Sequence, residues 1–356
     1  MVSLDDLRSA VGMDQAWVDL FKTKFSQSCS LDIPLTVMSI FSGAGLMDFG
    51  FQKEGFKIIY AMDFNADACK TYRHNMGDHI HCGDVTQLKE SDIPENVSVI
   101  ISGSPCQGYS NSNRQTHYLD NPKNKLVKEN IRVVRMNPFA KVCVIENVPQ
   151  LLSAGDGAIL REIEELLSDF EITSGVVRAS DMGSAQNRDR AFILASKIGR
   201  IELPKPEMHV LNTVRTAFSG LTDDIPNQQD YSKPKMETLE RIRQIPEGGN
   251  WRNLTGDQDQ RHHSNYLKRL LWDSPSITLA NARKSLILHP SEDRTLSVRE
   301  MARLFDLPDS FKFFGGLGEM QQQVVNGVPV KMASAVARVV KDAINAFNQS
   351  RVCVAI

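Results

Sequence analysis

The feature that most constrains the fold is a regular alternation of short apolar segments with helical ones between residues 35 and 196. The apolar segments read LTVMSI, KIIYAMD, HIHCGD, VSVIISG and KVCVIEN, and glycine turns or amphipathic stretches separate them. Short strands that alternate with helices predict an α/β domain with a mainly parallel sheet. Ligands of such sheets bind beyond the carboxyl ends of the strands, so the residues that follow each strand are the first candidates for a functional site.

The composition of the chain changes after this region. Loop-forming Pro, Gly, Asn, Asp and Gln crowd the stretch that follows, and helical periodicity returns near residue 291. We therefore expect an N-terminal helical extension over 1–33, a main α/β domain over 34–204, a smaller irregular domain over 205–290, and a helical return over 291–356 that completes the main domain.

Composition predicts an intracellular, cytoplasmic protein. The chain lacks an apolar run long enough to span a bilayer, and its first residues, MVSLDDLRSA, do not resemble a signal peptide. Its six cysteines show no C-x-x-C pair, which argues against a structural metal and a disulfide framework. The net charge is -2, but residues 111–141 carry seven Lys and Arg against two Asp and Glu. A local basic stretch therefore exists within a chain of nearly neutral charge.

A glycine-rich turn, FSGAG, follows the first predicted strand. Glycines allow close approach of a ligand to the backbone, and the start of the next helix presents free N–H groups. Asp63 and Asp84 end the next two strands, where a carboxylate can accept hydrogen bonds from ribose hydroxyls. Each feature alone is equally compatible with a plain turn or a helix cap. Together, in this order, they favour a cofactor that contains a nucleoside.

Cys106 lies just beyond the strand VSVIISG, between Pro105 and Gln107. A free cysteine is often a small buried hydrophobic residue. This one is in a Gly- and Ser-rich turn that leads into the basic stretch, which favours an exposed thiol with a lowered pKa. We interpret Cys106 as a candidate nucleophile.

Glu146 ends the strand KVCVIEN and would lie at the same edge of the sheet. A carboxyl group held against a cysteine there could stay protonated and act as a hydrogen-bond donor. Arg188 and Arg190 alternate in AQNRDRAF, so on a strand both would point to one face and could hold a phosphate or the edge of a base. A solvated arginine face is the simpler alternative.

These groups suit the chemistry of carbon 5 of cytosine, which is a poor nucleophile. Addition of a thiolate to carbon 6 turns the ring into an enamine that can attack a methyl group, and an acid at ring nitrogen 3 would stabilise the charge that develops. The segments FSGAGLMDFGF, GSPCQGYS, VIENVPQLL, SAQNRDRAFILA, RTLSVREMARLFDLPDSF and NGVPVKMASAVARVV occur in the order found in cytosine-C5 DNA methyltransferases. The chain resembles this family from about Val37 to Val340.

The resemblance implies a Rossmann-like S-adenosylmethionine-dependent domain and a separate target-recognition domain over 205–290. Cys106 would be the nucleophile, Glu146 would contact N3 of the base, Arg188 and Arg190 would hold a nucleotide flipped out of the duplex, and Asn147 would order the cysteine loop. The residues expected at the cofactor, with Phe64 against adenine, are Phe41, Gly43, Gly45, Asp63, Phe64, Asp84, Pro105, Asn326 and Val328.

Double-stranded DNA is the partner that the resemblance implies. The basic stretch would be a mobile loop that closes over DNA with its lysines on phosphates. Arg252, Arg261 and Arg283 could read bases or bind phosphates, and we weigh these two roles equally. The residues expected to contact DNA are Gln107, Ser110, Lys123, Lys125, Arg252, Arg261 and Arg283. We expect a monomer without a metal, acting either alone or with a cognate restriction endonuclease as a functional partner.

Some positions depart from the family pattern. Asp63 stands where glutamate is usual, Val325 stands where glycine is common, and residues 1–33 have no counterpart. Three other functions fit part of the chain: a methyltransferase of transfer RNA, a pyrimidine-nucleotide methylase akin to thymidylate synthase, and a catalytically silent DNA-binding protein. The absence of a Cys-Phe-Thr stretch argues against the first, the cofactor motif against the second, and the intact Cys106 and Glu146 against the third.

Overall fold

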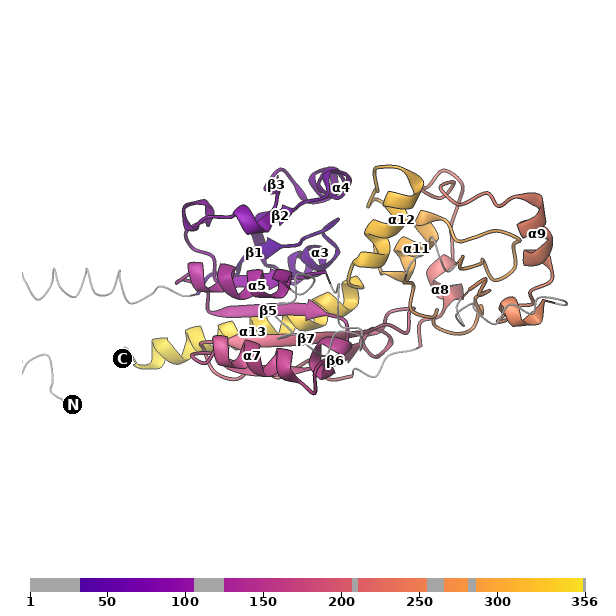
Figure 1. Cartoon of the computed structure of the whole chain (residues 1–356). Coiled ribbons are helices and arrows are strands. Elements are labelled where there is room, and N and C mark those ends of the chain that lie inside the picture. The colour runs from indigo at the N-terminus through magenta and orange to yellow at the C-terminus, as the bar shows by residue number, and fades with distance from the viewer. Residues whose placement is uncertain (1–32, 106–124, 207–210, 255–265, 281–285, 355–356) are drawn as a thin grey trace, which may run out of the picture.

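The computed structural model describes residues 33–105, 125–206, 211–254, 266–280 and 286–354. The expected N-terminal extension and the nucleophile loop thus lie outside the described residues, apart from Ile33 and the residues up to Pro105. Within the described residues the chain forms two lobes, an α/β lobe and a smaller lobe made mostly of loops and short helices (Figure 1).

The α/β lobe is built on a seven-stranded sheet of order β3-β2-β1-β4-β5-β7-β6. The strands are β1 (Thr36–Ile40), β2 (Lys57–Asp63), β3 (Ile80–Cys82), β4 (Val99–Ser102), β5 (Val142–Asn147), β6 (Glu171–Arg178) and β7 (Asp189–Ser196). β1 to β5 pair in parallel, whereas β7 runs antiparallel to both β5 and β6. The predicted mainly parallel α/β sheet is confirmed.

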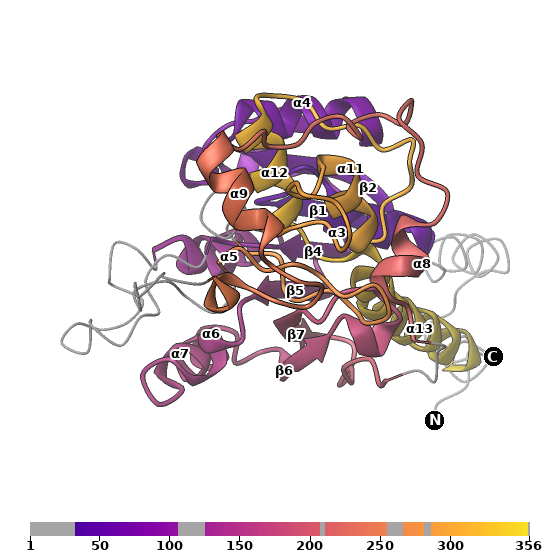
Figure 2. The ribbon, with the colours of Figure 1, turned by 90° about the vertical axis from the view of Figure 1, so that its right-hand side faces the viewer.

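Helices cover both faces of the sheet. On one face lie α3 (Leu46–Lys53), α4 (Ala66–Met76) and the long α13 (Val330–Val354), and on the other lie α5 (Lys125–Met136), α6 (Gln150–Ser153) and α7 (Ala158–Leu166). Figure 2 shows the sheet between α13 on one side and α5 to α7 on the other. The central strands are apolar along their length because both of their faces are buried.

The alternation of side chains along a strand explains how one strand contributes to two apolar clusters. Val37 packs with α3 and α13, while the next residue, Met38, packs with the opposite layer. Successive side chains of a strand point to opposite faces, so each central strand contributes alternately to the two clusters. This arrangement fixes the carboxyl ends of β1 to β5 along one edge of the sheet.

The smaller lobe contains α8 (Val214–Phe218), α9 (Met236–Arg243), α11 (Val298–Leu304) and α12 (Leu317–Asn326). One apolar cluster joins residues from Val214 to Val330, and α11 packs against both α8 and α12. We expected everything after residue 290 to complete the main domain. In the structure α11 packs against α8 and α12, α12 also contacts α4 of the α/β lobe, and α13 lies along the sheet. We propose that the smaller lobe extends through α12.

Candidate active site

A cavity of about 780 Å³ opens at the carboxyl ends of the parallel strands, between the two lobes. It is lined from one side by the segments that follow β1, β2, β3, β4 and β5, and from the other by the end of α12. The predicted site residues that line it are Phe41, Gly43, Asp63, Phe64, Asp84, Pro105, Glu146, Asn147, Arg190, Asn326 and Val328. Residues from both ends of the sequence thus meet at one cavity.

The glycine turn after β1 has an unusual backbone. Phe41, Gly43 and Gly45 have φ angles of 54°, 55° and 90°. A Cβ at Gly43 would meet no heavy atom within 4 Å, whereas one at Gly45 would lie 2.8 Å from the Tyr72 ring. Gly43 therefore faces open space in the cavity wall, and Gly45 allows α3 to pack on α4.

Asp63 holds this turn in place. Its Oδ2 accepts the N–H of Gly43 at 2.7 Å, and its Oδ1 accepts the N–H of Asn65 at 2.9 Å. Burial raises the pKa of Asp63, and the two N–H donors oppose the rise. We expected a carboxylate that receives ribose hydroxyls. The structure shows that the same carboxylate also connects the glycine turn to the end of β2.

Phe64 and Asp84 follow β2 and β3. The Phe64 side chain is 80% exposed and lines the cavity, which is a rare position for a large apolar ring. Asp84 Oδ1 accepts the N–H of Thr86 at 2.9 Å and caps a short 3-10 helix, Val85–Gln87. Both residues therefore line the same edge of the cavity, just beyond the ends of β2 and β3.

Asp48 is a cavity residue that sequence reasoning overlooked. It lies on α3, is fully buried, and accepts hydrogen bonds from Ser39 Oγ and Tyr72 Oη, each at 2.8 Å. Burial raises its pKa to about 6. A carboxylate among the apolar residues of GLMDFGF was the available signal, because a buried acid needs specific partners.

Glu146 and Arg190 form a close ion pair at the end of β5. Arg190 Nε lies 2.8 Å from Glu146 Oε1, and both side chains are largely buried. Burial raises the pKa of Glu146, and the neighbouring guanidinium groups of Arg190 and Arg188 oppose this rise without cancelling it. Gly103 makes room for the carboxyl group, since a Cβ there would lie 3.5 Å from Glu146 Oε2.

The stem of the nucleophile loop is tied to β5 and α5. Asn147 Nδ2 donates to the carbonyl oxygen of Ser104 at 3.0 Å, and Asn130 Nδ2 donates to Ser104 Oγ at 3.1 Å. Pro105, which directly follows, is exposed at the cavity. The chain therefore enters the loop containing Cys106 from a fixed point beside Glu146.

Arg188 lies elsewhere than expected. β7 begins at Asp189, so Arg188 precedes the strand and does not share the outward face of Arg190. Its guanidinium is buried, 1% exposed, and donates to the carbonyl oxygens of Leu279, Val325 and Gly327. The expectation of one shared face applied to two arginines on a strand, and Arg188 lies just outside the strand, so the role of Arg188 at a flipped nucleotide stays a prediction.

The predicted DNA-binding residues are mostly outside the described residues, as are Cys106, Gln107, Ser110, Lys123, Arg261 and Arg283. Lys125 begins α5. Arg252 lies on the surface of the smaller lobe, with its guanidinium 5.2 Å from the centre of the Trp251 ring.

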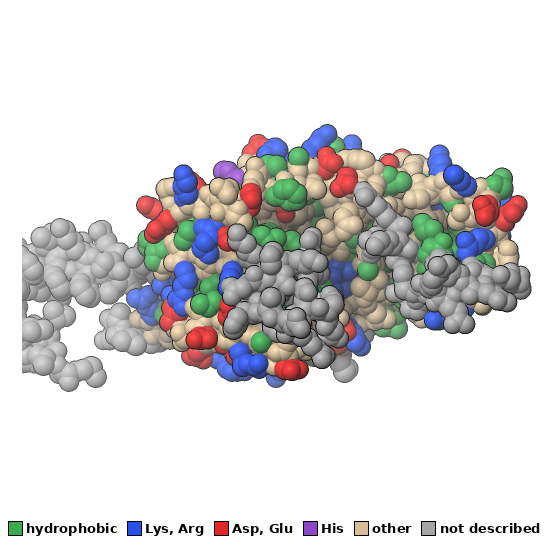
Figure 3. Space-filling view, viewed as in Figure 1, with side chains coloured by type: hydrophobic (Ala, Val, Ile, Leu, Met, Phe, Trp, Pro, Cys, Tyr) green, Lys and Arg blue, Asp and Glu red, His purple; other side chains and the backbone are tan. Residues whose placement is uncertain are grey.

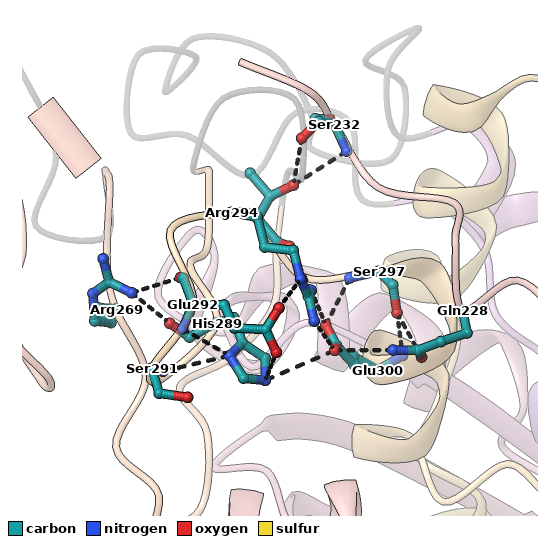
Figure 4. Close-up of polar contacts among 10 residues, drawn as sticks. Gln228, Ser232, Arg269, His289, Ser291, Glu292, Arg294, Ser297 and Glu300 are labelled. Atoms are coloured by element: carbon teal, nitrogen blue, oxygen red, sulfur yellow. Dashed lines mark hydrogen bonds and ion pairs between the residues drawn. The ribbon is translucent and has the colours of Figure 1, made fainter. Parts of the chain in front are cut away.

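A buried polar network orders the smaller lobe (Figure 4). Arg294 binds Glu300 through two hydrogen bonds of 2.8 and 2.7 Å, and Gln228 also donates to Glu300 at 3.3 Å. Ser297 and Glu300 form a capping box at the start of α11. The Ser-x-x-Glu spacing was a sequence signal for this helix start, but we assigned no role to Arg294 or Glu300.

Across the described ranges, no group of three or more His, Cys, Asp or Glu is arranged to hold a metal ion. No helix in the same ranges has the length and apolar character that a bilayer crossing requires.

Comparison with known sequences finds related proteins over most of the chain. The family model of the C-5 cytosine-specific DNA methylase matches residues 35–342. Type II methyltransferase M1.HphI of Haemophilus parahaemolyticus is 31% identical over 349 residues, which cover 91% of this chain and 90% of the relative. Type II methyltransferase M.Eco47II of Escherichia coli is 30% identical over 358 residues, with 93% and 84% covered.

Comparison with solved structures supports the fold. A putative DNA modification methyltransferase encoded within an E. coli prophage superposes with a TM-score of 0.71 at 22% identity, covering 87% of this chain and 99% of that one. The Dnmt2 methyltransferase of S. pombe gives a TM-score of 0.64 at 16% identity, with 86% and 98% covered. By its sequence match, the chain belongs to the C-5 cytosine-specific DNA methylase family, the class of DNA (cytosine-5-)-methyltransferases.

Proposed function

We propose that this protein transfers a methyl group from S-adenosylmethionine to carbon 5 of a cytosine flipped out of a specific short duplex sequence. One observation carries the proposal. A single cavity joins the Gly43, Asp63 and Phe64 wall to the Glu146–Arg190 pair and to Pro105, which directly precedes Cys106. Cofactor and target base would thus meet in one space.

The residues present fit the proposed cofactor. The open space at Gly43 leaves room beside the backbone, and the exposed ring of Phe64 offers a stacking surface for adenine. Asp63 and Asp84 provide carboxylates at the ribose and adenine edges, while Asn326 and Val328 close the opposite wall. When bound, S-adenosylmethionine supplies an electrophilic methyl group.

The chain's own residues would perform the remaining steps. The Cys106 thiolate adds to carbon 6 of cytosine, and carbon 5 gains the nucleophilic character that methylation requires. Glu146, in its protonated form, donates a hydrogen bond to N3 and stabilises the charge of the adduct, while Arg190 orients the Glu146 carboxyl group. Carbon 5 would then take up the methyl group as the methyl–sulfur bond breaks, which leaves S-adenosylhomocysteine. Solvent water would accept the carbon 5 proton, the electrons of that C–H bond would re-form the C5–C6 double bond, and Cys106 would leave as the thiolate.

DNA binding would depend on local rather than overall charge. Acidic and basic side chains are interspersed over the visible face of the α/β lobe, as Figure 3 shows. We propose that Lys123, Lys125, Arg252, Arg261 and Arg283 contact the duplex as phosphate or base ligands, joined by Gln107 and Ser110 near the flipped base. Because the relatives are Type II methyltransferases, we further propose that a restriction endonuclease of the same sequence specificity is a functional partner of a monomeric, cytoplasmic enzyme.

The test is methylation of mixed-sequence duplex DNA by the purified protein and by Cys106→Ser, read by conversion sequencing. We expect 5-methylcytosine within one short sequence, and its complete loss in the variant. A duplex that contains 5-fluorocytosine at that sequence should form a covalent complex with the wild type, because fluorine at carbon 5 cannot leave as a proton does. No methylation of DNA by the wild type, or methylation of transfer RNA instead, would contradict the proposal.

A further inference from the structure

The segment 184–188, between β6 and β7, is one of the places where hydrogen bonds join the two lobes. Asn187 N donates to Ser276 O at 2.8 Å, and Ser276 N donates back to Ala185 O at 2.8 Å. The side chain of Gln186 donates to Leu304 O, at the end of α11, at 3.2 Å. This interlobe segment therefore contacts the smaller lobe along two separate stretches of chain.

Arg188 ends the interlobe segment and adds a third attachment. Its Nη2 donates to Val325 O at 2.6 Å and to Gly327 O at 3.1 Å, and its Nη1 donates to Leu279 O at 2.7 Å. The guanidinium also stacks over the Phe305 ring, 5.0 Å from its centre. Val325 O belongs to the last turn of α12, where carbonyl groups lack partners within the helix and a cation is favourable.

Two of the carbonyl groups that Arg188 binds flank a residue in the wall of the cofactor cavity. Asn326 lies between Val325 and Gly327, and both Asn326 and Val328 line the cavity. The same wall packs closely against the start of α3, since a Cβ at Gly327 would lie 2.3 Å from Cδ2 of Leu46, the residue that follows the glycine turn. A shift of this short stretch would therefore change the width of the cavity on the cofactor side.

We propose that Arg188 is a positioning residue that fixes residues 325–328 against the start of β7 and thereby sets the affinity for the cofactor. This role rests on the proposed function for the identity of the cofactor. Arg190, two positions later, has the separate task of holding Glu146 at the base. Of the two arginines of one motif, Arg190 thus holds Glu146 and Arg188 holds the stretch from Val325 to Gly327.

The experiment compares Arg188→Lys with Arg190→Lys, using calorimetric binding of S-adenosylhomocysteine and steady-state methylation. Lysine keeps the charge of Arg188 but lacks the planar fork that reaches three carbonyl groups. For Arg188→Lys we expect the Kd of S-adenosylhomocysteine and the KM of S-adenosylmethionine to rise about tenfold or more, with kcat within about twofold of wild type at saturating cofactor. For Arg190→Lys we expect a lowered kcat and a Kd within about threefold of wild type.

An unchanged Kd of S-adenosylhomocysteine in Arg188→Lys, together with a loss of kcat, would overturn the proposal. It would instead favour a role for Arg188 at the target base. Gly327→Ala provides an independent variant if Arg188→Lys does not fold, because its Cβ displaces the same wall from the Leu46 side. It should weaken cofactor binding while leaving kcat at saturation, and an unchanged Kd would again contradict the role of the wall.

Binding and activity separate this inference from the proposed function. If the wild type binds S-adenosylhomocysteine but methylates no DNA, the proposed activity is contradicted. The Kd of S-adenosylhomocysteine in Arg188→Lys, compared with the wild type, still tests the role of Arg188. If the wild type does not bind S-adenosylhomocysteine, the inference falls together with the cofactor assignment.

Discussion

Glu146 is subject to two opposing influences that decide its protonation. Burial favours the neutral acid and raises the pKa, while the guanidinium of Arg190, 2.8 Å away, favours the carboxylate. The net direction is upward, so Glu146 keeps its proton to a higher pH than an exposed glutamate does. A buried acid with a raised pKa beside the stem of a nucleophile loop is suited to donate a hydrogen bond to a ring nitrogen.

The pH profile of kcat tests this assignment. The protonated fraction of Glu146 falls as pH rises through its raised pKa, so we expect an alkaline decline of kcat in the wild type. Glu146→Gln is neutral at every pH and retains an N–H donor, and we expect a kcat lower by roughly 10²-fold without that decline. Glu165→Gln, at an exposed position of α7, should keep the wild-type profile. Persistence of the decline in Glu146→Gln would contradict the role.

At the scale of elements, the alternation of strands and helices up to residue 196 was predictable because each strand carries its own burial pattern. The helices of the C-terminal part were also visible as periodic stretches. The orientation of Arg188 was not predictable, because it depends on β7 starting at Asp189, where Arg178 of β6 binds the Asp189 side chain. The packing of α11 against α8 and α12 was likewise not predictable from the sequence, because the apolar face of a helix does not specify which helix it packs against.

The glycine turn gives a prediction at this scale. Alanine at Gly43 or Gly45 must adopt a left-handed backbone, at a cost of about 1 kcal/mol in the free energy of unfolding. At Gly45 the Cβ also collides with the buried Tyr72 ring, so we expect Gly45→Ala to lose about 3 kcal/mol or more. Gly43→Ala should instead weaken S-adenosylhomocysteine binding, because its Cβ occupies the open cavity.

Urea unfolding and calorimetric binding distinguish the two variants. Equal losses of stability would show that the packing of α3 on α4 does not depend on the missing Cβ at Gly45. Unaltered cofactor binding in Gly43→Ala would show that the space beside this residue is not where the cofactor lies.

At the scale of the whole molecule, the residues that follow the strands and line the cavity were predictable from the sequence, whereas most predicted DNA contacts lie outside the described residues. The cavity residues adjoin strand ends, and the sheet brings strand ends together whatever the loops contain. The place of Asp48 in the cavity was not predictable, because it depends on hydrogen bonds from Ser39 and Tyr72, which only the tertiary fold brings close. Recognition residues lie in a lobe without long periodic elements, so their positions do not follow from the chain alone.

Salt dependence of DNA affinity tests the basic stretch. Each lysine that neutralises a phosphate releases counterions, so replacing Lys123 and Lys125 together by alanine should reduce the slope of log K against log salt by about 2. Lys53→Ala is the control, because Lys53 is an exposed lysine at the C-terminal end of α3, whereas the carboxyl edge of the sheet adjoins the start of this helix. An unchanged slope in the double variant would remove these lysines from the interface.

Helix α13 closes against α3 through contacts between distant parts of the chain. Ser334 Oγ donates to Gly50 O across 284 positions, and residues 326–328 complete the cavity just before α13 begins. During translation the glycine turn leaves the ribosome long before residues 326–328, which complete the cavity wall, have been made. We therefore expect a polypeptide that ends before residue 326 to lack a complete cavity and to show no methyltransferase activity, so that a premature stop codon there abolishes the activity instead of lowering it.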